Sequence, residues 1–184
     1  DPPHTPEREP DHVRATTGGD STRLSGGAAT THSDDNGLVH PPRVAPRPVV
    51  TVPIYRKAHE KEAVLAHADK VAAALKAVGI RVKVDDRDNM KPGAKYFEWE
   101  RRGVPLRLEV GPRAVQSDAV MTVRRDDRTK EPVPLSALAE RVPAILDTMQ
   151  KDLLERARTL REERTGDVSS LAELSEKLDA APGW

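Results

Sequence analysis

The spacing of apolar residues changes along the chain, and each spacing predicts a different kind of element. Val49–Ile54 is a β-branched run typical of a buried strand, whereas residues 80–84 and 106–110 alternate apolar with charged side chains, as strands with one buried face do. Residues 58–78 carry apolar side chains at helical spacing, and Gly79 follows where a helix end is expected. The first half of the pattern therefore predicts a strand, a helix and a strand.

The second half continues the alternation. A helix opens at Pro92 and runs through Arg102, residues 119–124 and 131–133 have the pattern of a hairpin, and residues 135–163 form a long helix. Within that helix, Pro143 should produce a kink or a restart. A weak amphipathic helix is expected over residues 169–180. Together these elements predict an α/β fold, with a mixed sheet of about five strands flanked by three helices.

The N-terminal part of the chain has a different composition. Residues 1–39 contain few apolar side chains larger than alanine, so they cannot bury enough surface to offset their chain entropy. We expect this segment to be largely disordered. Residues 41–48 are rich in proline and predict an extended linker. The folded domain is therefore expected to begin at about residue 45.

The charge of the chain is balanced, with Lys+Arg 30 against Asp+Glu 30, so any binding to a nucleic acid must come from a local patch. The absence of cysteine excludes disulfides and cysteine-ligated zinc, and it fits a reducing compartment. No apolar run approaches the roughly 20 residues that span a bilayer, and residues 1–11 do not resemble a signal peptide. These features predict a soluble, cytoplasmic protein with no membrane partner.

The histidines show no metal-ligand spacing, so no metal site is predicted. His59 and His67 are assigned to a solvated face of the helix over residues 58–78. Arginines and glutamates interleave over residues 155–164, which favours a solvated helix that pairs with itself over a phosphate-binding ridge.

Three segments resemble the prolyl-tRNA synthetase family of the archaeal and eukaryotic type. The strongest resembles the family's anticodon-binding domain nearly position for position, and it contains the runs VKVDDRDN (82–89), KPGAKYFEWE (91–100) and GVPLRLEVGPR (103–113). The second is VPIYRK (52–57), similar to the first strand of that domain. The third is similar to the end of the catalytic domain, including its third signature motif, and contains GDSTRL (19–24), THSDDNG (31–37) and PPRVAP (41–46).

The resemblance implies the fold of the anticodon-binding domain of class II aminoacyl-tRNA synthetases. It divides the chain into a degenerate remnant of the catalytic domain with a linker (1–44), the anticodon-binding domain (45–164) and the truncated start of a C-terminal region (165–184). The implied function is binding of the anticodon stem-loop of proline tRNA in protein biosynthesis. The family ligates proline to tRNA with ATP; this chain is expected to need no cofactor and not to catalyse that reaction alone.

Arg23 matches the family arginine that packs against ATP, where a guanidinium can pair with phosphate and stack on the base. The first two signature motifs would need more residues than precede Arg23, and large apolar residues of the family pattern are replaced around it. Arg23 is therefore either a remnant of an ATP-binding site or, as we favour, a solvated relic.

A cluster of charged residues between positions 85 and 107 is the candidate for base recognition. Carboxylates accept hydrogen bonds from the amino edge of guanine, Lys and Arg donate to guanine O6 and N7, and proline anticodons share two guanines. Tyr96, Phe97 and Trp99 could stack on bases, although at least one of these rings must belong to the core. For any single residue, a structural ion pair is the stronger interpretation. The candidate RNA-binding residues are Asp85, Asp86, Arg87, Lys95, Glu98 and Arg107.

Two other functions remain open from the sequence. The chain could be one subunit of a split proline–tRNA ligase whose catalytic half is another chain, or a protein-interaction or regulatory module that has lost RNA binding. Its expected partner is the anticodon stem-loop, with a separate catalytic chain or a second copy of itself as further partners, and no DNA.

Overall fold

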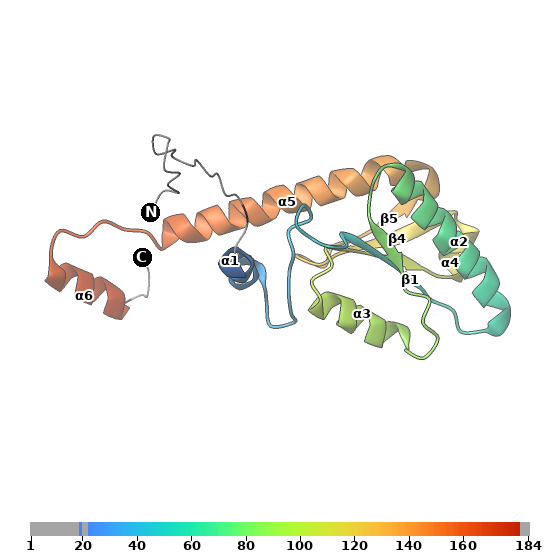
Figure 1. The fold of residues 1–184 in the computed structure, drawn as a ribbon, viewed down its shortest axis with the longest axis horizontal. Coiled ribbons are helices and arrows are strands. Elements are labelled where there is room, and N and C mark those ends of the chain that lie inside the picture. The colour runs from blue at the N-terminus through green and yellow to red at the C-terminus, as the bar shows by residue number, and fades with distance from the viewer. Residues whose placement is uncertain (1–18, 20–21, 181–184) are drawn as a thin grey trace, which may run out of the picture.

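A five-stranded mixed sheet forms the centre of the computed structural model, which describes residue 19 and residues 22–180 (Figure 1). The strand order is β2-β1-β3-β4-β5, in which β1 runs parallel to both β2 and β3, while β3, β4 and β5 are antiparallel. The predicted mixed sheet is confirmed. The strands are β1 (Val49–Pro53), β2 (Val82–Val84), β3 (Leu106–Val110), β4 (Ala119–Arg124) and β5 (Lys130–Pro134).

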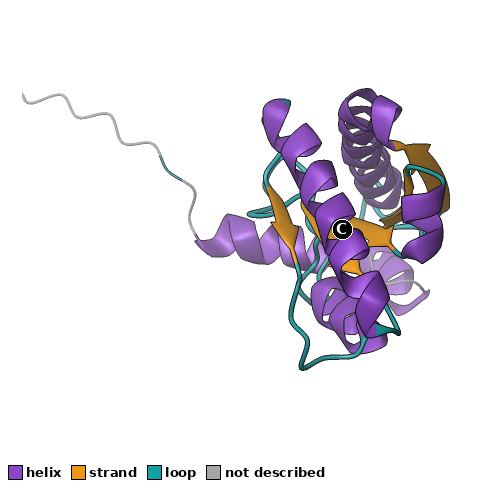
Figure 2. Ribbon diagram, turned by 90° about the vertical axis from the view of Figure 1, so that its right-hand side faces the viewer, coloured by secondary structure: helices purple, strands orange, loops and turns teal. Residues whose placement is uncertain are grey.

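Helices cover the two faces of the sheet unequally (Figure 2). The large core lies between α2, α5 and one face, and a smaller core lies between α3 and the other face. In Figure 1, α5 continues well beyond the sheet, and α6 follows it at the far end. The helices are α1 (Thr22–His32), α2 (Ala58–Ala77), α3 (Pro92–Arg101), α4 (Pro112–Gln116), α5 (Leu138–Glu163) and α6 (Leu171–Ala180).

The alternation of side chains along the strands sorts residues between the two cores. On β3, Leu106 and Leu108 enter the large core, which also contains Leu75 of α2 and Met149 of α5. Each of these side chains is fully buried, which stabilises the fold by about 1.5–3 kcal/mol per side chain. Val50 of β1, by contrast, points into the smaller core beneath α3. The helical and strand periods of the sequence thus place these residues correctly.

Part of the sheet lies beside α3 rather than under it, because α3 packs chiefly over β1. In the antiparallel register, Arg107 is opposite Val123 and Glu109 is opposite Met121. These positions alternate with Leu106 and Leu108, so they face the side of the sheet that carries α3. The fold therefore presents charged and apolar side chains of β3 and β4 next to the C-terminal half of α3.

The described part of the N-terminal segment contains one helix and a few contacts with the domain. Residues 22–32 form α1, which buries none of its side chains, while Val39 and Ala45 are buried in the domain. Polar contacts made by Asp34 also attach this segment to the domain. These contacts come from residues far away in the chain, so local composition, on which the expectation of little structure before residue 39 rests, does not indicate them. Residues 1–18 lie outside the described part of the chain.

Three other details differ from the sequence-based expectations. His67 is buried, not solvated, and one of its ring nitrogens lies 3.2 Å from the carbonyl oxygen of Ala119. Pro143 does not interrupt α5, which runs without a break from Leu138 to Glu163. The short helix α4 was not predicted; it begins with Pro112, whose fixed φ suits a first helical turn.

Candidate nucleic-acid interface

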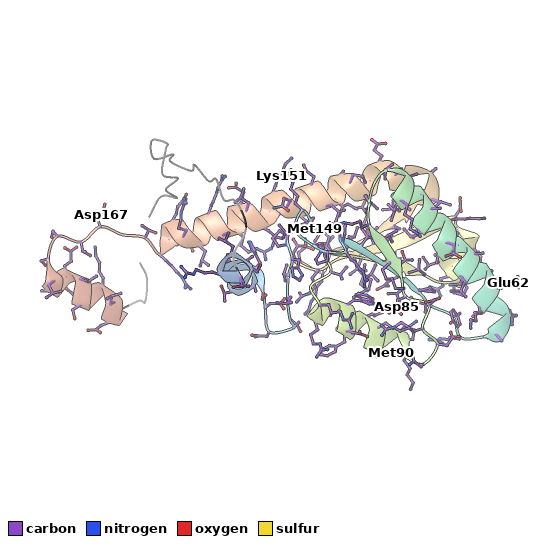
Figure 3. The ribbon with its side chains drawn as sticks, in the orientation of Figure 1. Glu62, Asp85, Met90, Met149, Lys151 and Asp167 are labelled. Carbon is purple, nitrogen blue, oxygen red and sulfur yellow. The ribbon has the colours of Figure 1, made fainter. Side chains whose placement is uncertain are left out.

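Asp85 is the centre of a buried polar network between the sheet and α3 (Figure 3). Its amide donates to the carbonyl oxygen of Thr51, which holds it against β1 directly after β2 ends. Its carboxylate accepts two hydrogen bonds from the guanidinium of Arg87, at 2.8 and 2.7 Å, and one from the indole of Trp99, at 2.7 Å. The ammonium group of Lys95 donates to the carbonyl oxygen of Asp85 at 2.9 Å.

The sequence of α3 explains why these partners meet. Pro92 occupies the start of the helix, and Lys95 and Trp99 are four residues apart, so they lie on the same face. The side chain of Asp85 is only 1% exposed and that of Lys95 only 3%. The carboxylate of Asp85 and the ammonium group of Lys95 therefore bind other groups of the protein. The network fixes α3 on the sheet, and Arg87 extends it outward to Glu98, at 2.8 Å.

Burial opposes the ionisation of Asp85, but the hydrogen bonds from Arg87 and Trp99 and the charge of Lys95 outweigh it and lower the pKa of this carboxyl to about 2. The ordinary value, 3.8, applies to the unfolded chain. Between these two values the unfolded state binds more protons than the folded state. The stabilisation by ionised Asp85 is therefore complete above about pH 4 and is lost as the pH falls toward 2.

We expect this titration to be visible in the acid unfolding of the chain. The pKa difference corresponds to roughly 2 kcal/mol of stability that is present near pH 5 and mostly lost by about pH 2. Urea unfolding of the wild type and of Asp85→Asn measures it, since the free-energy gap between the two should shrink as the pH falls. A gap of constant size from about pH 5 to about pH 2 would contradict the assignment.

Arg107 forms a second charged cluster beside the C-terminal half of α3. Its guanidinium donates to Glu100 at 2.6 Å and to Glu109 at 3.1 Å, and it lies over the ring of Tyr96, 4.1 Å from the ring centre. Burial and the charge of Glu109 raise the pKa of Tyr96 to about 12, although Arg107 opposes them. The cluster combines fixed donors, two carboxylate acceptors and an aromatic ring.

The two carboxylates of this cluster were not singled out by the sequence analysis. Glu109 is two residues from Arg107 on β3, so strand alternation alone places both side chains on one face. Glu100 is four residues from Tyr96 on α3, a spacing that brings those side chains together on the helix surface. With Arg107 as a candidate, the strand spacing points to Glu109 and the helix spacing points to Glu100.

A cleft of about 260 Å³ opens at the carboxyl ends of β1 and β2, next to the network of Asp85. In open α/β sheets this edge is where ligands commonly bind. Met90 lies in the loop that leads from this edge into α3 (Figure 3). The cleft is lined by Pro53, Tyr55, Arg87, Asp88, Asn89, Met90, Lys91, Pro92 and Lys95.

The six candidate RNA-binding residues do not lie together: some belong to the buried network, some border the cleft, and one belongs to the second cluster. Asp85, Lys95 and most of Glu98 are enclosed, Arg87 is partly exposed at the cleft, and Arg107 belongs to the second cluster. Asp86 is exposed directly after the buried Asp85. Arg23 is exposed near the start of α1, a helix that contacts α5. Trp99 belongs to the core, whereas Phe97 is 62% exposed.

Two further observations concern the described residues. Within residues 22–180, no group of three or more His, Asp or Glu side chains is placed to hold a metal ion. No helix in the same range has the length and apolar character required to cross a membrane.

The structure is thus an α/β domain with two charged clusters beside α3. Residues 48–145 match the family model described as the anticodon binding domain, and the chain belongs to this family.

Its curated relatives include proline–tRNA ligase 2 of Clostridioides difficile (strain 630), 46% identical over 92% of this chain and 34% of the relative. Another is the proline–tRNA ligase of Lachnospira eligens, 51% identical over 84% of this chain and 31% of the relative. The chain thus spans about a third of the length of these relatives.

Solved structures give the same family. The prolyl-tRNA synthetase of Cryptosporidium parvum complexed with halofuginone and AMPPNP superposes with a TM-score of 0.82 at 39% identity, covering 86% of this chain and 32% of the other. A second structure of that enzyme, with L-proline and AMP, has a TM-score of 0.83. The recognition of an anticodon-binding domain of the prolyl-tRNA synthetase type is therefore confirmed.

Proposed function

We propose that this chain binds the anticodon stem-loop of proline tRNA on the surface beside α3. The observation that carries the proposal is the cluster of Arg107 with Glu100 and Glu109, which gathers donors and acceptors within one small area; Glu100 is its most exposed member, at 29%, and Arg107 is 10% exposed. Guanine presents O6 and N7 as acceptors and its N1–H and amino group as donors, so one base can use both kinds of partner. Proline anticodons supply two adjacent guanines.

The buried network has a supporting role in this proposal. Asp85 and Lys95 bind each other's polar groups inside the protein, so we propose that they fix α3 rather than contact RNA. Asp86 and Arg87 border the solvent and are the members of the first cluster best placed to reach a nucleotide, whereas Glu98 is only partly exposed and binds Arg87. Phe97 offers an exposed ring of the kind that stacks on unpaired bases.

We further propose that this binding serves the ATP-dependent ligation of proline to tRNA in the cytoplasm. This rests on the names of the relatives, two thirds of whose length lies outside the matched part. The partner that supplies proline activation could be a separate chain or a further part of the same protein. Arg23 stays a candidate ATP contact only in such a complex.

The test is binding of the purified chain to the proline anticodon stem-loop and to a stem-loop of another tRNA without guanines in the anticodon. Because the chain has no net charge, affinity should depend on a few base contacts, and the slope of log K against log salt should be shallower than about −3, equivalent to about four phosphates. A steep slope with equal affinity for both stem-loops would indicate non-specific attraction and favour the interaction-module alternative.

A further inference from the structure

A short stretch of chain before the domain is fastened to the end of α3. We call residues 34–40 the docking segment. Its turn is closed by paired main-chain hydrogen bonds between Asp34 and Gly37, at 3.1 and 3.0 Å. Beyond the turn, the amide of Leu38 donates to the carbonyl oxygen of Arg101 and that of His40 to the carbonyl oxygen of Gly103, each at 3.2 Å. The docking segment therefore binds the main chain at the end of α3.

The two backbones approach too closely for side chains between them. Gly37 has a φ of +129°, and a Cβ there would lie 2.5 Å from the Cα of Arg101. Gly103 has a φ of +70°, and a Cβ there would lie 2.6 Å from the ring of His40 and 2.7 Å from the Cβ of Leu38. Glycine is required at both places by conformation and by space. The contact is thus built for one relative position of the docking segment and α3.

Arg125 joins this segment to both α3 and the sheet. Its side chain is only 2% exposed, at the end of β4. The guanidinium donates to both carboxylate oxygens of Asp34, at 2.8 and 2.6 Å, and to the carbonyl oxygen of Gly37 at 3.2 Å. Its Nε donates to the carbonyl oxygen of Glu100 at 3.0 Å. A planar guanidinium holds these partners in a fixed geometry.

Glu100 is the link to the proposed RNA-binding surface. Its main chain is held by Arg125, and its carboxylate binds Arg107 at 2.6 Å. A shift of the Glu100 backbone would therefore move both the acceptor and the donor that we assign to guanine. A displacement of about 1 Å is enough to weaken a directional contact of this kind.

We propose that Arg125 is a positioning residue for base recognition: by binding Asp34 and the Glu100 main chain together, it couples the docking segment to the specificity of the Arg107 cluster. The inference rests on the proposed function of that cluster. Such coupling is reciprocal, so a base bound at the cluster stabilises the docked segment as much as docking improves the recognition of the base. The helix α1 ends just before Asp34, so its attachment to the domain responds to RNA as well.

Asp34→Asn tests the coupling with little risk to the fold, because Asp34 lies on a partly exposed turn outside the core. The matched control is Asp35→Asn, which makes the same charge change at the neighbouring exposed residue. Affinities are measured for the proline anticodon stem-loop and for one whose middle guanine is replaced by adenine. We expect Asp34→Asn to reduce the ratio of the two affinities by about fivefold, chiefly through weaker binding of the proline loop. Asp35→Asn should keep the wild-type ratio.

A second measurement uses the wild-type chain alone. Amide hydrogen exchange at Leu38 and His40 reports docking directly, since these amides bind the end of α3. Adding the proline stem-loop should slow their exchange by about fivefold, and the adenine-substituted loop at equal occupancy should slow it less.

The outcomes separate the inference from the function on which it rests. A wild-type chain that prefers the guanine loop, with an unchanged ratio in Asp34→Asn and no effect of RNA on Leu38 or His40, overturns the inference and leaves the proposed function intact. A wild-type chain with no preference removes both. A reduced ratio in Asp34→Asn but not in Asp35→Asn, with protection of the docking segment by RNA, supports the role of Arg125.

Discussion

Replacing Asp85 with alanine is expected to destabilise the domain by about 3–5 kcal/mol, because it leaves the buried ammonium group of Lys95 without its counter-charge. Lys95 is only 3% exposed, and Trp99 would lose the acceptor of its indole hydrogen bond. Arg87 would lose the two bonds that hold its guanidinium at the end of the sheet. Equilibrium urea unfolding near neutral pH measures the loss, which is a large fraction of the stability of a domain of this size.

The neighbouring residue provides the control for this substitution. Asp86→Ala removes the same charge at an exposed position and should change the free energy of unfolding by no more than about 0.5 kcal/mol. Similar losses for the two variants would mean that Asp85 is not the centre of the network. They would also remove the reason for separating Asp85 from the RNA-contacting residues.

Arg107→Lys should weaken binding of the proline anticodon stem-loop by about 1–3 kcal/mol, while binding of a loop without guanines changes much less. Lysine keeps the positive charge but lacks the planar fork that reaches Glu100 and a base at the same time. The measurement is a pair of dissociation constants for each loop at one fixed salt concentration.

Arg158→Lys is the matched control, because it makes the same chemical change on the exposed surface of α5. Arg158 binds Glu155 of the same helix at 2.8 Å, as the mixed charges of this segment predict. Its substitution should leave both affinities unchanged. An equal loss for both loops in Arg107→Lys would indicate a phosphate contact or a general loss of structure rather than base recognition.

The fold was predictable because its signals are local. Alternation along β3 and helical spacing along α2 identify which side chains face the core, and the structure bears out both. The expectation that at least one aromatic ring of α3 belongs to the core was also correct, since Trp99 is buried while Phe97 is exposed.

The arrangement of the charged residues was less predictable, because it depends on contacts between distant parts of the chain. Nothing local to Asp34 indicates Arg125 as its partner, and nothing local to His67 indicates that its ring meets the carbonyl oxygen of Ala119 at the start of β4. For the same reason, a single cluster of candidate residues in the sequence became two in the structure. Asp85 and Lys95 joined the interior, and Arg107 joined Glu100 and Glu109.

The most direct test of the account is the affinity of the wild-type chain for proline anticodon stem-loops that differ in a single base. Replacing either the middle or the third anticodon guanine with adenine should weaken binding by about 1–3 kcal/mol, the loss expected for one well-placed base contact. Replacing a base pair in the stem should have little effect. Equal affinity for all of these loops would contradict anticodon recognition by this surface.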